Sequence, residues 1–194
     1  MPKPSPQARD RIVAGAADMI SRRGLNATSI RDLAKHAKAP LGSTYHYFPD
    51  GKPQLATEAV RYAGETVARA LREEFEAGPV AGLRAFLALW RDIVVTTDFR
   101  AGCPVLAVAI EEPPADEVPA ALDAAAEVFD GWETLLADSL RRHGADAGQA
   151  AQLATLIVAS VEGTIAMCRA KRSAQPFDHT AEQLHALVLQ AIDR

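Results

Sequence analysis

Residues 28–55 read TSIRDLAKHAKAPLGSTYHYFPDGKPQL, and this stretch decides the fold of the first part of the chain. Ser29 followed by Asp32 is a capping-box pattern, which predicts the start of a helix. Apolar residues then recur at helical spacing as far as Pro40, which disfavours helix at Ala39 and suits the first turn of a second helix. Two short helices joined by a tight turn are therefore predicted.

The second short helix, Leu41–Phe48, carries hydroxyl, imidazole and phenol groups. Such groups suit hydrogen bonds to base edges and phosphates, and a glycine allows close approach to DNA. Lys52 follows at the start of the next helix, where it can neutralise a phosphate. A helical hairpin with an exposed Tyr and His is the alternative interpretation. The residues predicted to contact DNA are Thr28, Arg31, Gly42, Ser43, Thr44, Tyr45, His46, Tyr47 and Lys52.

The segment resembles the N-terminal domain of the tetracycline-repressor (TetR) family. The family pattern T-x-x-R-x-[IL]-A is matched by residues 28–34, and G-[ST]-x-Y-x-[YH]-F by residues 42–48. The FPDGK sequence at 48–52 is similar to the LmrA and YxaF group within this family, as is GCPV at 102–105 with AVAIE at 107–111. The resemblance implies a ligand-responsive DNA-binding regulator.

The chain departs from the family pattern at three positions. Lys38 stands where a turn glycine is usual, and a positive φ there costs on the order of 1 kcal/mol. Leu41 replaces a usual Lys and Thr44 a usual Leu, and both changes bear on which operator is recognised.

Charge is distributed unevenly along the sequence. Residues 1–52 contain nine Lys and Arg against four acidic residues, a net charge of +5. Residues 53–194 have a net charge of −9, so the whole chain has a net charge of −4. A basic first part meets the phosphate requirement of DNA, and an acidic second part needs another role. We therefore predict a helix-turn-helix DNA-binding domain in residues 1–52 and a helical ligand-binding and dimerisation domain in residues 53–194.

Helical spacing and capping signals predict an all-α chain of about nine helices. One begins at Ser29, and the others are expected at Pro6–Arg23, Leu41–Phe48, Pro53–Glu76, Val80–Thr97, Pro104–Glu111 (stopped by Pro113-Pro114), Val118–His143, Ala147–Lys171 and Thr180–Ile192.

Composition predicts a cytoplasmic protein. We expect no membrane association, because no apolar run has the length of a bilayer span and the N-terminus lacks a secretory signal. Two cysteines, Cys103 and Cys168, form neither a disulfide framework nor a metal-ligand pattern. No metal and no cofactor is predicted.

Apolar residues of the second part are candidates for an effector cavity, although each alone fits an ordinary core position. The TetR resemblance implies a cavity for a small apolar or aromatic molecule. The candidate ligand-binding residues are Phe86, Leu89, Trp90, Ile93, Cys103, Leu106, Ile110, Phe129, Trp132, Val161, Glu162 and Ile165.

The helix at 147–171 is nearly apolar all round, so one face must find a partner. The resemblance implies that it pairs with the last helix and their two-fold mates in a homodimer. Such a dimer presents two recognition helices to a palindromic operator. The candidate interface residues are Leu156, Ala159, Ser160, Gly163, Leu184, Leu187 and Val188.

The mechanism inferred from the resemblance is a conformational switch. A repressor bound to double-stranded DNA is released when an apolar effector favours a state in which the heads no longer fit the operator. Two alternatives stay open: a thiol-based redox sensor acting through Cys103, and an architectural DNA-binding protein without an effector.

No constellation of residues indicates an enzyme. His179 and His185 do not share a helix face, and Ser160 is not in a nucleophile elbow. The adjacent acids Glu73-Glu74 and Glu111-Glu112 diverge around a helix, which is typical of solvated faces. A catalytic function is therefore not predicted.

Overall fold

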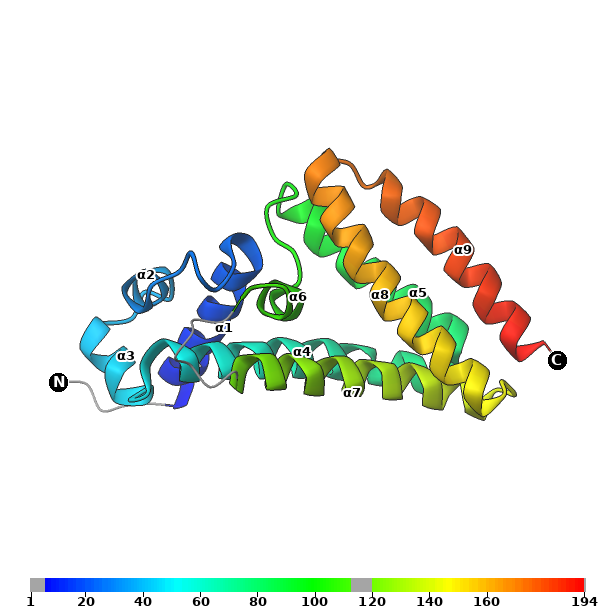
Figure 1. Cartoon of the computed structure of the whole chain (residues 1–194), viewed down its shortest axis with the longest axis horizontal. Helices are drawn as coiled ribbons and strands as arrows, with labels where there is room; N and C mark the ends of the chain where they lie inside the picture. Colours follow the sequence, from blue (N-terminus) through cyan, green and yellow to red (C-terminus); the bar gives the residue numbers. More distant parts are fainter. Residues whose placement is uncertain (1–5, 113–119, 194) are drawn as a thin grey trace. The chain divides into compact units, whose positions relative to one another are not determined.

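The computed structural model describes residues 6–112 and 120–193, which form nine α-helices and no strand (Figure 1). The helices are α1 Pro6–Arg23, α2 Ile30–His36, α3 Leu41–Tyr47, α4 Gly51–Ala77, α5 Pro79–Thr96, α6 Pro104–Ala109, α7 Ala120–Arg142, α8 Ala147–Lys171 and α9 Gln175–Ile192. The predicted all-α fold is confirmed.

The helices belong to two compact units. The first contains residues 1–65 and 103–128, and the second contains residues 66–102 and 129–194. The first unit therefore includes α1 to α3, the beginning of α4 and all of α6. The functional division predicted after residue 52 stays a prediction.

Most helix ends lie within two residues of their predicted positions, and α1 and α8 agree at both ends. The exception is α9, which begins at Gln175 and not at Thr180. Pro176 occupies its first turn, where a missing N–H costs nothing, and Phe177 is buried there. The predicted helix start at Val118 and the stop at Pro113-Pro114 lie outside the described residues.

In the first unit, α1, α2 and α3 pack on one another, and α6 packs on α1. The interior is formed by Ile12 and Ile20 of α1, Leu33 of α2 and the fully buried ring of Phe48. Arg9 lies over that ring, 5.4 Å from its centroid. Helices of only seven residues are unstable alone, so this packing holds α2 and α3 in place.

The turn between α2 and α3 shows the strain expected from the sequence. Lys38 has φ +52°, the left-handed conformation that favours glycine. The N–H of Ala39 donates to the carbonyl of Ala34 at 2.9 Å, so the turn is closed by backbone hydrogen bonds. Packing on α1 therefore offsets a local cost of about 1 kcal/mol.

The predicted capping box of α2 is present. The Asp32 N–H donates to the Ser29 hydroxyl at 3.1 Å, and the Ser29 N–H donates to the Asp32 carboxylate at 3.4 Å. The Ser29 hydroxyl, and after it the Ser29 N–H, hold the pKa of Asp32 below its ordinary value by donating to the carboxylate. A lowered carboxyl pKa contributes stability that is present above the unfolded-state pKa and is lost as pH falls through the folded-state pKa.

We expect Ser29→Ala to lower the free energy of unfolding by about 1 kcal/mol at pH 7, because the cap of α2 is lost. Part of this difference should disappear as pH falls below the ordinary Asp pKa and then through the lower folded-state pKa of Asp32, where protonation removes the carboxylate as an acceptor. Urea unfolding of both proteins between pH 7 and pH 3 measures it. A difference of the same size at every pH would show that the carboxylate takes no part in the cap.

In the second unit, α5, α8 and α9 pack on one another. The buried side of α8 carries Leu153, Ile157, Val161 and Ile165 at helical spacing. Ser139 of α7 donates to the carbonyl of Phe75 at 2.7 Å. These contacts tie the end of α4 and the end of α7 to one core.

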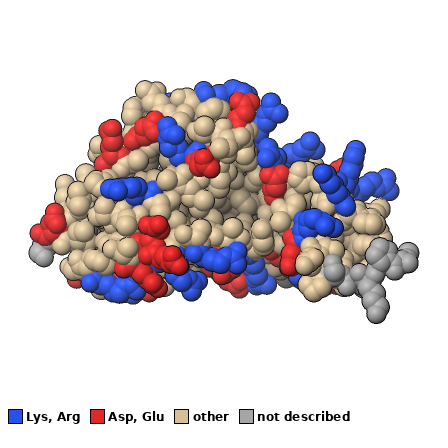
Figure 2. Space-filling model, turned by 180° about the vertical axis from the view of Figure 1, so that it is seen from behind, with Lys and Arg blue, Asp and Glu red and all other residues tan. Residues whose placement is uncertain are grey.

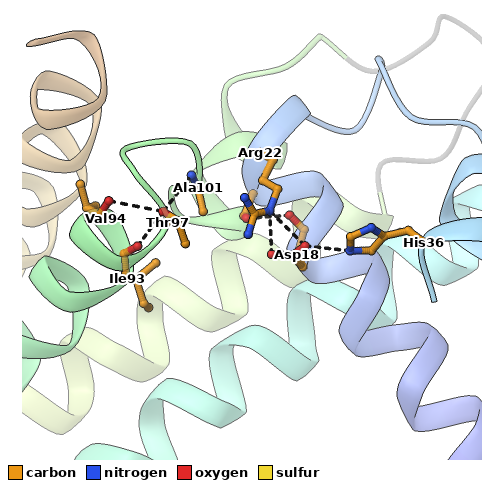
Figure 3. Close-up of polar contacts among 8 residues, drawn as sticks. Asp18, Arg22, His36, Ile93, Val94, Thr97 and Ala101 are labelled. Atoms are coloured by element: carbon orange, nitrogen blue, oxygen red, sulfur yellow. Dashed lines mark hydrogen bonds and ion pairs between the residues drawn. The ribbon is translucent and has the colours of Figure 1, made fainter. Parts of the chain in front are cut away.

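The C-terminus of α5 is closed by Thr97. Its hydroxyl donates to the carbonyl of Ile93 at 2.7 Å and accepts from the Ala101 N–H at 3.2 Å (Figure 3). Asp98 and Phe99 adopt positive φ values of 54° and 59° in the turn that follows. These hydrogen bonds and the two left-handed residues therefore fix the path of the chain from the end of α5 to residue 102.

By length and composition, α8 is apolar enough to cross a membrane. This finding corrects the expectation that no apolar run has the length of a bilayer span. Half of its most apolar 18-residue window is buried inside the protein, as in the core helix of a helical bundle.

Candidate functional site

The exposed side of α3 is formed by most of the residues predicted to contact DNA. Gly42, Tyr45 and His46 are exposed, with Tyr45 at 50%, and Ser43 and Tyr47 are half-buried. A Cβ added to Gly42 meets no atom within 4 Å, so the backbone of α3 is open to close approach at this point. This surface, Gly42, Ser43, Tyr45, His46 and Tyr47, is called the α3 face below.

Thr28 and Thr44 are buried, and this corrects the expectation that their side chains face DNA. Thr44 has no exposed surface, and its hydroxyl donates to the carbonyl of Pro40 at 3.3 Å. Thr28 is 2% exposed, and its hydroxyl donates to the carbonyls of Gly24 and Leu25 at 2.6 and 2.8 Å. Both residues support the helix-turn-helix, α2 and α3, from inside.

Two further residues predicted to contact DNA, Arg31 and the predicted phosphate contact Lys52, lie before and after α3 in the sequence. Arg31 is exposed on α2, and Lys52 is half-buried in the first turn of α4. Cations and free N–H groups at a helix N-terminus favour phosphate binding. Elsewhere acidic and basic side chains lie among one another over much of the face drawn in Figure 2. The difference in net charge between residues 1–52 and residues 53–194 therefore does not give either part a surface of one sign.

Asp18 of α1 joins α1 to α2 through a network of polar contacts that the sequence analysis missed. Its carboxylate accepts from Arg22 Nε at 2.9 Å and lies 2.8 Å from His36 Nε2 (Figure 3). Arg22 is four residues after Asp18, a spacing that a helical reading identifies, whereas His36 is distant in sequence. The network holds the last turn of α2 against α1.

Four aromatic residues predicted to bind an effector meet in the second unit. The ring centroid of Trp132 lies 6.0 Å from those of Phe86 and Trp90 and 5.9 Å from that of Phe129, all edge to face. Phe86, Trp90 and Trp132 are at most 3% exposed. This group is called the aromatic cluster below. The buried Trp90 Nε1 has no hydrogen-bond partner among the described residues.

The other predicted effector residues lie in different places. Leu89 and Ile93 are half-buried on α5, and Val161, Glu162 and Ile165 are buried on α8 in the same unit. Cys103, Leu106 and Ile110 belong to the first unit. Ile110 is 73% exposed at the end of α6, where it follows the last helical residue.

Both cysteines are buried. The Cys103 sulfur accepts from the Leu106 N–H at 3.5 Å and caps α6. Burial raises the pKa of the Cys168 thiol, which keeps it protonated and unreactive at neutral pH. Cys168 is therefore a packing residue. Among the described residues, no group of three His, Cys, Asp or Glu side chains has the arrangement of a metal site.

The predicted interface residues fall into two sets. Leu156, Ala159 and Gly163 are exposed on α8, and Leu187 is exposed on α9, with Leu156 at 46%. Ser160 is half-buried. Leu184 and Val188 are at most 3% exposed, because α9 packs this side on α5 and α8. For these two residues the expectation of an interface contact is corrected: their side chains belong to the core of a single chain.

Glu111 was interpreted as a solvated residue, and this interpretation is wrong. Its carboxylate accepts from the N–H groups of Leu25 and Asn26 in the α1–α2 turn, at 2.9 and 2.6 Å. The signal in the sequence was its place in the AVAIE stretch that marks the LmrA and YxaF group. Spacing alone does not find such a contact, which joins residues 86 apart.

Comparison with known families matches both parts of the chain. Residues 12–59 match "Bacterial regulatory proteins, tetR family", and residues 79–183 match "Transcriptional regulator LmrA/YxaF-like, C-terminal domain". The HTH-type transcriptional regulator Rv0196 of Mycobacterium tuberculosis is 41% identical over 184 residues, covering 93% of this chain and 94% of that protein. YxaF of Bacillus subtilis is 31% identical over 183 residues, covering 93% and 95%.

A solved structure of the same fold comes from Rhodobacter sphaeroides, a regulatory protein described as TetR. It superposes with a TM-score of 0.80 at 22% identity, covering 93% of this chain and 98% of that one. At this identity the likeness concerns the fold.

Proposed function

Because the chain belongs to the TetR family of transcriptional regulators, with a C-terminal domain of the LmrA/YxaF type, we propose that it is a homodimeric repressor of a palindromic operator. An apolar or aromatic small molecule releases it from DNA. The observation that carries the proposal is the exposed α3 face held by the packing of α3 on α1 and α2. The family consists of regulators, so the chain is not an enzyme.

DNA binding follows from the composition of the α3 face. Its hydroxyl, imidazole and phenol groups project from one short helix, and no acidic residue interrupts it. The α3 face reads bases in the major groove, while Arg31 and Lys52 contact phosphates. A protein with this activity works on chromosomal DNA, in the cytoplasm.

Dimerisation is supported by the exposed side of α8. Leu156, Ala159, Gly163, Ala166 and Met167 are exposed at spacings of three and four residues, and none is charged. Small residues at 159 and 163 let a second helix approach closely. One short recognition helix makes too few base contacts for a specific site, whereas a two-fold dimer doubles them at a spacing of about 34–36 Å.

Effector binding is supported by the aromatic cluster. Apolar pockets that bind small molecules combine aromatic walls with a few polar groups that fix orientation. The Trp90 indole N–H, buried and unpartnered among the described residues, is such a group. An unmade hydrogen bond in the interior costs about 1–3 kcal/mol, and an effector with an acceptor atom recovers it. The effector therefore carries an aromatic body and an acceptor.

Release from DNA requires that the effector bind two conformations with different affinity. In the proposed switch, the bound effector favours a tilt of α4 that changes the spacing of the two heads. A ligand that binds tightly without changing operator affinity, across a panel of aromatic acceptors, would count against the switch.

The test is binding to DNA from the region flanking the gene of this protein, measured by fluorescence anisotropy from 50 to 200 mM salt. We expect Ser43→Ala to weaken operator binding about tenfold or more, because a base contact is lost from each half-site.

Lys52→Ala should weaken specific and non-specific binding alike. It should also reduce the slope of log K against log salt by about 2, since two phosphate contacts disappear from the dimer.

Arg72→Ala is the matched control, because Arg72 is an exposed cation of α4 far from α3 in sequence. It should leave both the affinity and the salt slope unchanged. If Ser43→Ala binds the operator as tightly as the wild type, the α3 face does not read bases. Equal affinity of the wild type for operator and random DNA would favour an architectural protein.

The redox alternative has its own test. Peroxide should leave operator binding by the wild type unchanged, because Cys103 is 3% exposed and a sensor thiol needs access to oxidant. Loss of binding in peroxide that Cys103→Ser prevents would favour the sensor over effector release.

A further inference from the structure

The turn between α1 and α2, Gly24–Thr28, is held by a side chain from far along the sequence. The N–H of Leu25 donates to Glu111 Oε1 at 2.9 Å, and the N–H of Asn26 donates to Glu111 Oε2 at 2.6 Å. Each carboxylate oxygen therefore takes one of two consecutive backbone amides. Hydrogen bonds to an ionised acceptor are about twice as strong as those between neutral groups.

Several other polar groups of the turn are hydrogen-bonded around this contact. The N–H of Gly24 donates to the carbonyl of Ile20 at 2.8 Å, and the Thr28 hydroxyl donates to the carbonyls of Gly24 and Leu25. Asn26 Nδ2 donates to the carbonyl of Glu112 at 3.2 Å. Two consecutive backbone donors of the turn therefore depend on Glu111.

Gly24 shows how closely the carboxylate sits. Its φ is +79°, and a Cβ at this position would lie 1.9 Å from Glu111 Oε1. The backbone conformation favours glycine here, and any side chain at this position would displace the carboxylate from its present place.

The turn leads directly into the helix-turn-helix formed by α2 and α3. Thr28 ends it, and Ser29 begins the capping box of α2, on which α3 packs. On the other side, Glu111 follows α6, and α6 packs on α1. The carboxylate therefore joins the segment after α6 to the start of the helix-turn-helix, within one compact unit.

We propose that Glu111 is a positioning residue for DNA recognition: by accepting the Leu25 and Asn26 amides, it sets the α1–α2 turn and with it the placement of α2 and α3. The inference rests on the proposed function, since it concerns how the α3 face is presented to the operator. It assigns a role to the last residue of the AVAIE stretch, whose carboxylate contacts the turn before α2.

The test compares Glu111→Gln with Glu112→Gln. Glutamine has the same shape, but it offers one acceptor oxygen, and its NH2 group faces a backbone N–H that it cannot accept. We expect Glu111→Gln to weaken operator binding about tenfold and to leave binding to random DNA unchanged or slightly stronger. Glu112→Gln removes the same charge one residue away, but only the backbone carbonyl of Glu112 contacts the turn. It should retain the wild-type ratio of specific to non-specific affinity.

Amide hydrogen exchange provides a second readout that does not need DNA. In Glu111→Gln, exchange of the Leu25 and Asn26 amides should become at least tenfold faster, while the amides of α5 and α8 keep their protection. A Glu111→Gln protein with wild-type exchange at Leu25 and Asn26, or with the wild-type specificity ratio, overturns the proposal. If Glu111→Gln does not fold, the milder Glu111→Asp, shorter by one methylene, is measured in the same way.

The two proposals fail separately. If the wild type shows no operator preference, the proposed function fails, and the exchange experiment still decides whether Glu111 holds the turn. If the wild type binds its operator and Glu111→Gln binds it equally well, only the positioning role is lost. The double variant Gly24→Ala with Glu111→Gln adds a check. Both changes disturb the same contact, so the double variant should lose less operator affinity than the sum of the losses of the two single variants.

Discussion

Gly163→Arg is expected to abolish dimerisation and to weaken operator binding by about 100-fold or more, the loss that follows when two linked heads become independent. Gly163 is exposed in the middle of α8, and a Cβ added there meets no atom within 4 Å of the chain. An arginine therefore fits a single protomer without strain. In a dimer that packs α8 against its mate, the same side chain pushes the two helices apart.

The fold of the protomer should survive this change. Glycine in a helix interior costs about 0.5–1 kcal/mol relative to alanine, so a larger residue at 163 favours the isolated helix. Circular dichroism should show unchanged helix content, while sedimentation velocity shows a monomer. The loss of DNA binding is then a consequence of the lost dimer and not of unfolding.

Gly131→Arg is the matched control. Gly131 is also an exposed glycine inside a helix, α7, and an added Cβ there also meets nothing within 4 Å. It lies outside the proposed interface, so this variant should remain a dimer with wild-type operator affinity. A Gly163→Arg protein that remains dimeric would show that the exposed side of α8 is not the interface.

Phe86→Ala is expected to lower the free energy of unfolding by about 3–5 kcal/mol. The ring is 2% exposed and lies 6.0 Å from the ring of Trp132 and 6.5 Å from that of Trp90. Its removal takes away buried apolar area, two edge-to-face contacts and the packing that fills the space between helices α5 and α7. The near-ultraviolet circular dichroism of both tryptophans should weaken at the same time.

Urea unfolding at one fixed protein concentration measures this loss, since the stability of a dimer depends on concentration. Leu89→Ala on the same helix is the comparison, because Leu89 is half-buried and outside the aromatic cluster. It should cost clearly less than Phe86→Ala. A Phe86→Ala protein within 1 kcal/mol of the wild type would show that the aromatic cluster contributes little to the stability of the fold.

Much of the local structure was predictable because it depends on neighbours in sequence. The capping box at Ser29 and Asp32, the helix break at Pro40 and the strained Lys38 all follow from hydrogen bonds and steric limits within a few residues. The start of α9 at Gln175 was not predicted, because the first turn of this helix is fixed by the burial of Phe177, which is a contact between distant parts of the chain.

Within the candidate sites, residue type was predictable and exposure was not. Thr44 and Tyr45 are neighbours on one short helix, yet one is buried and the other half exposed. Leu184 and Leu187 are three apart on α9, and only Leu187 is available to a partner. The seven-residue α3 is too short for a periodicity to mark its inner face, and on α9 residue type does not separate two leucines that lie on different sides of one turn.

The amino-acid sequence by itself determined the helices, the family and the chemistry of the α3 face, since these depend on local hydrogen bonding, side-chain period and residue type. Only the tertiary structure decided that the aromatic residues of α5 and α7 meet in one cluster and that Glu111 accepts two amides of a turn 86 residues away. Contacts between distant segments arise from helix packing, which places side chains in three dimensions and leaves no spacing in the sequence to find them by.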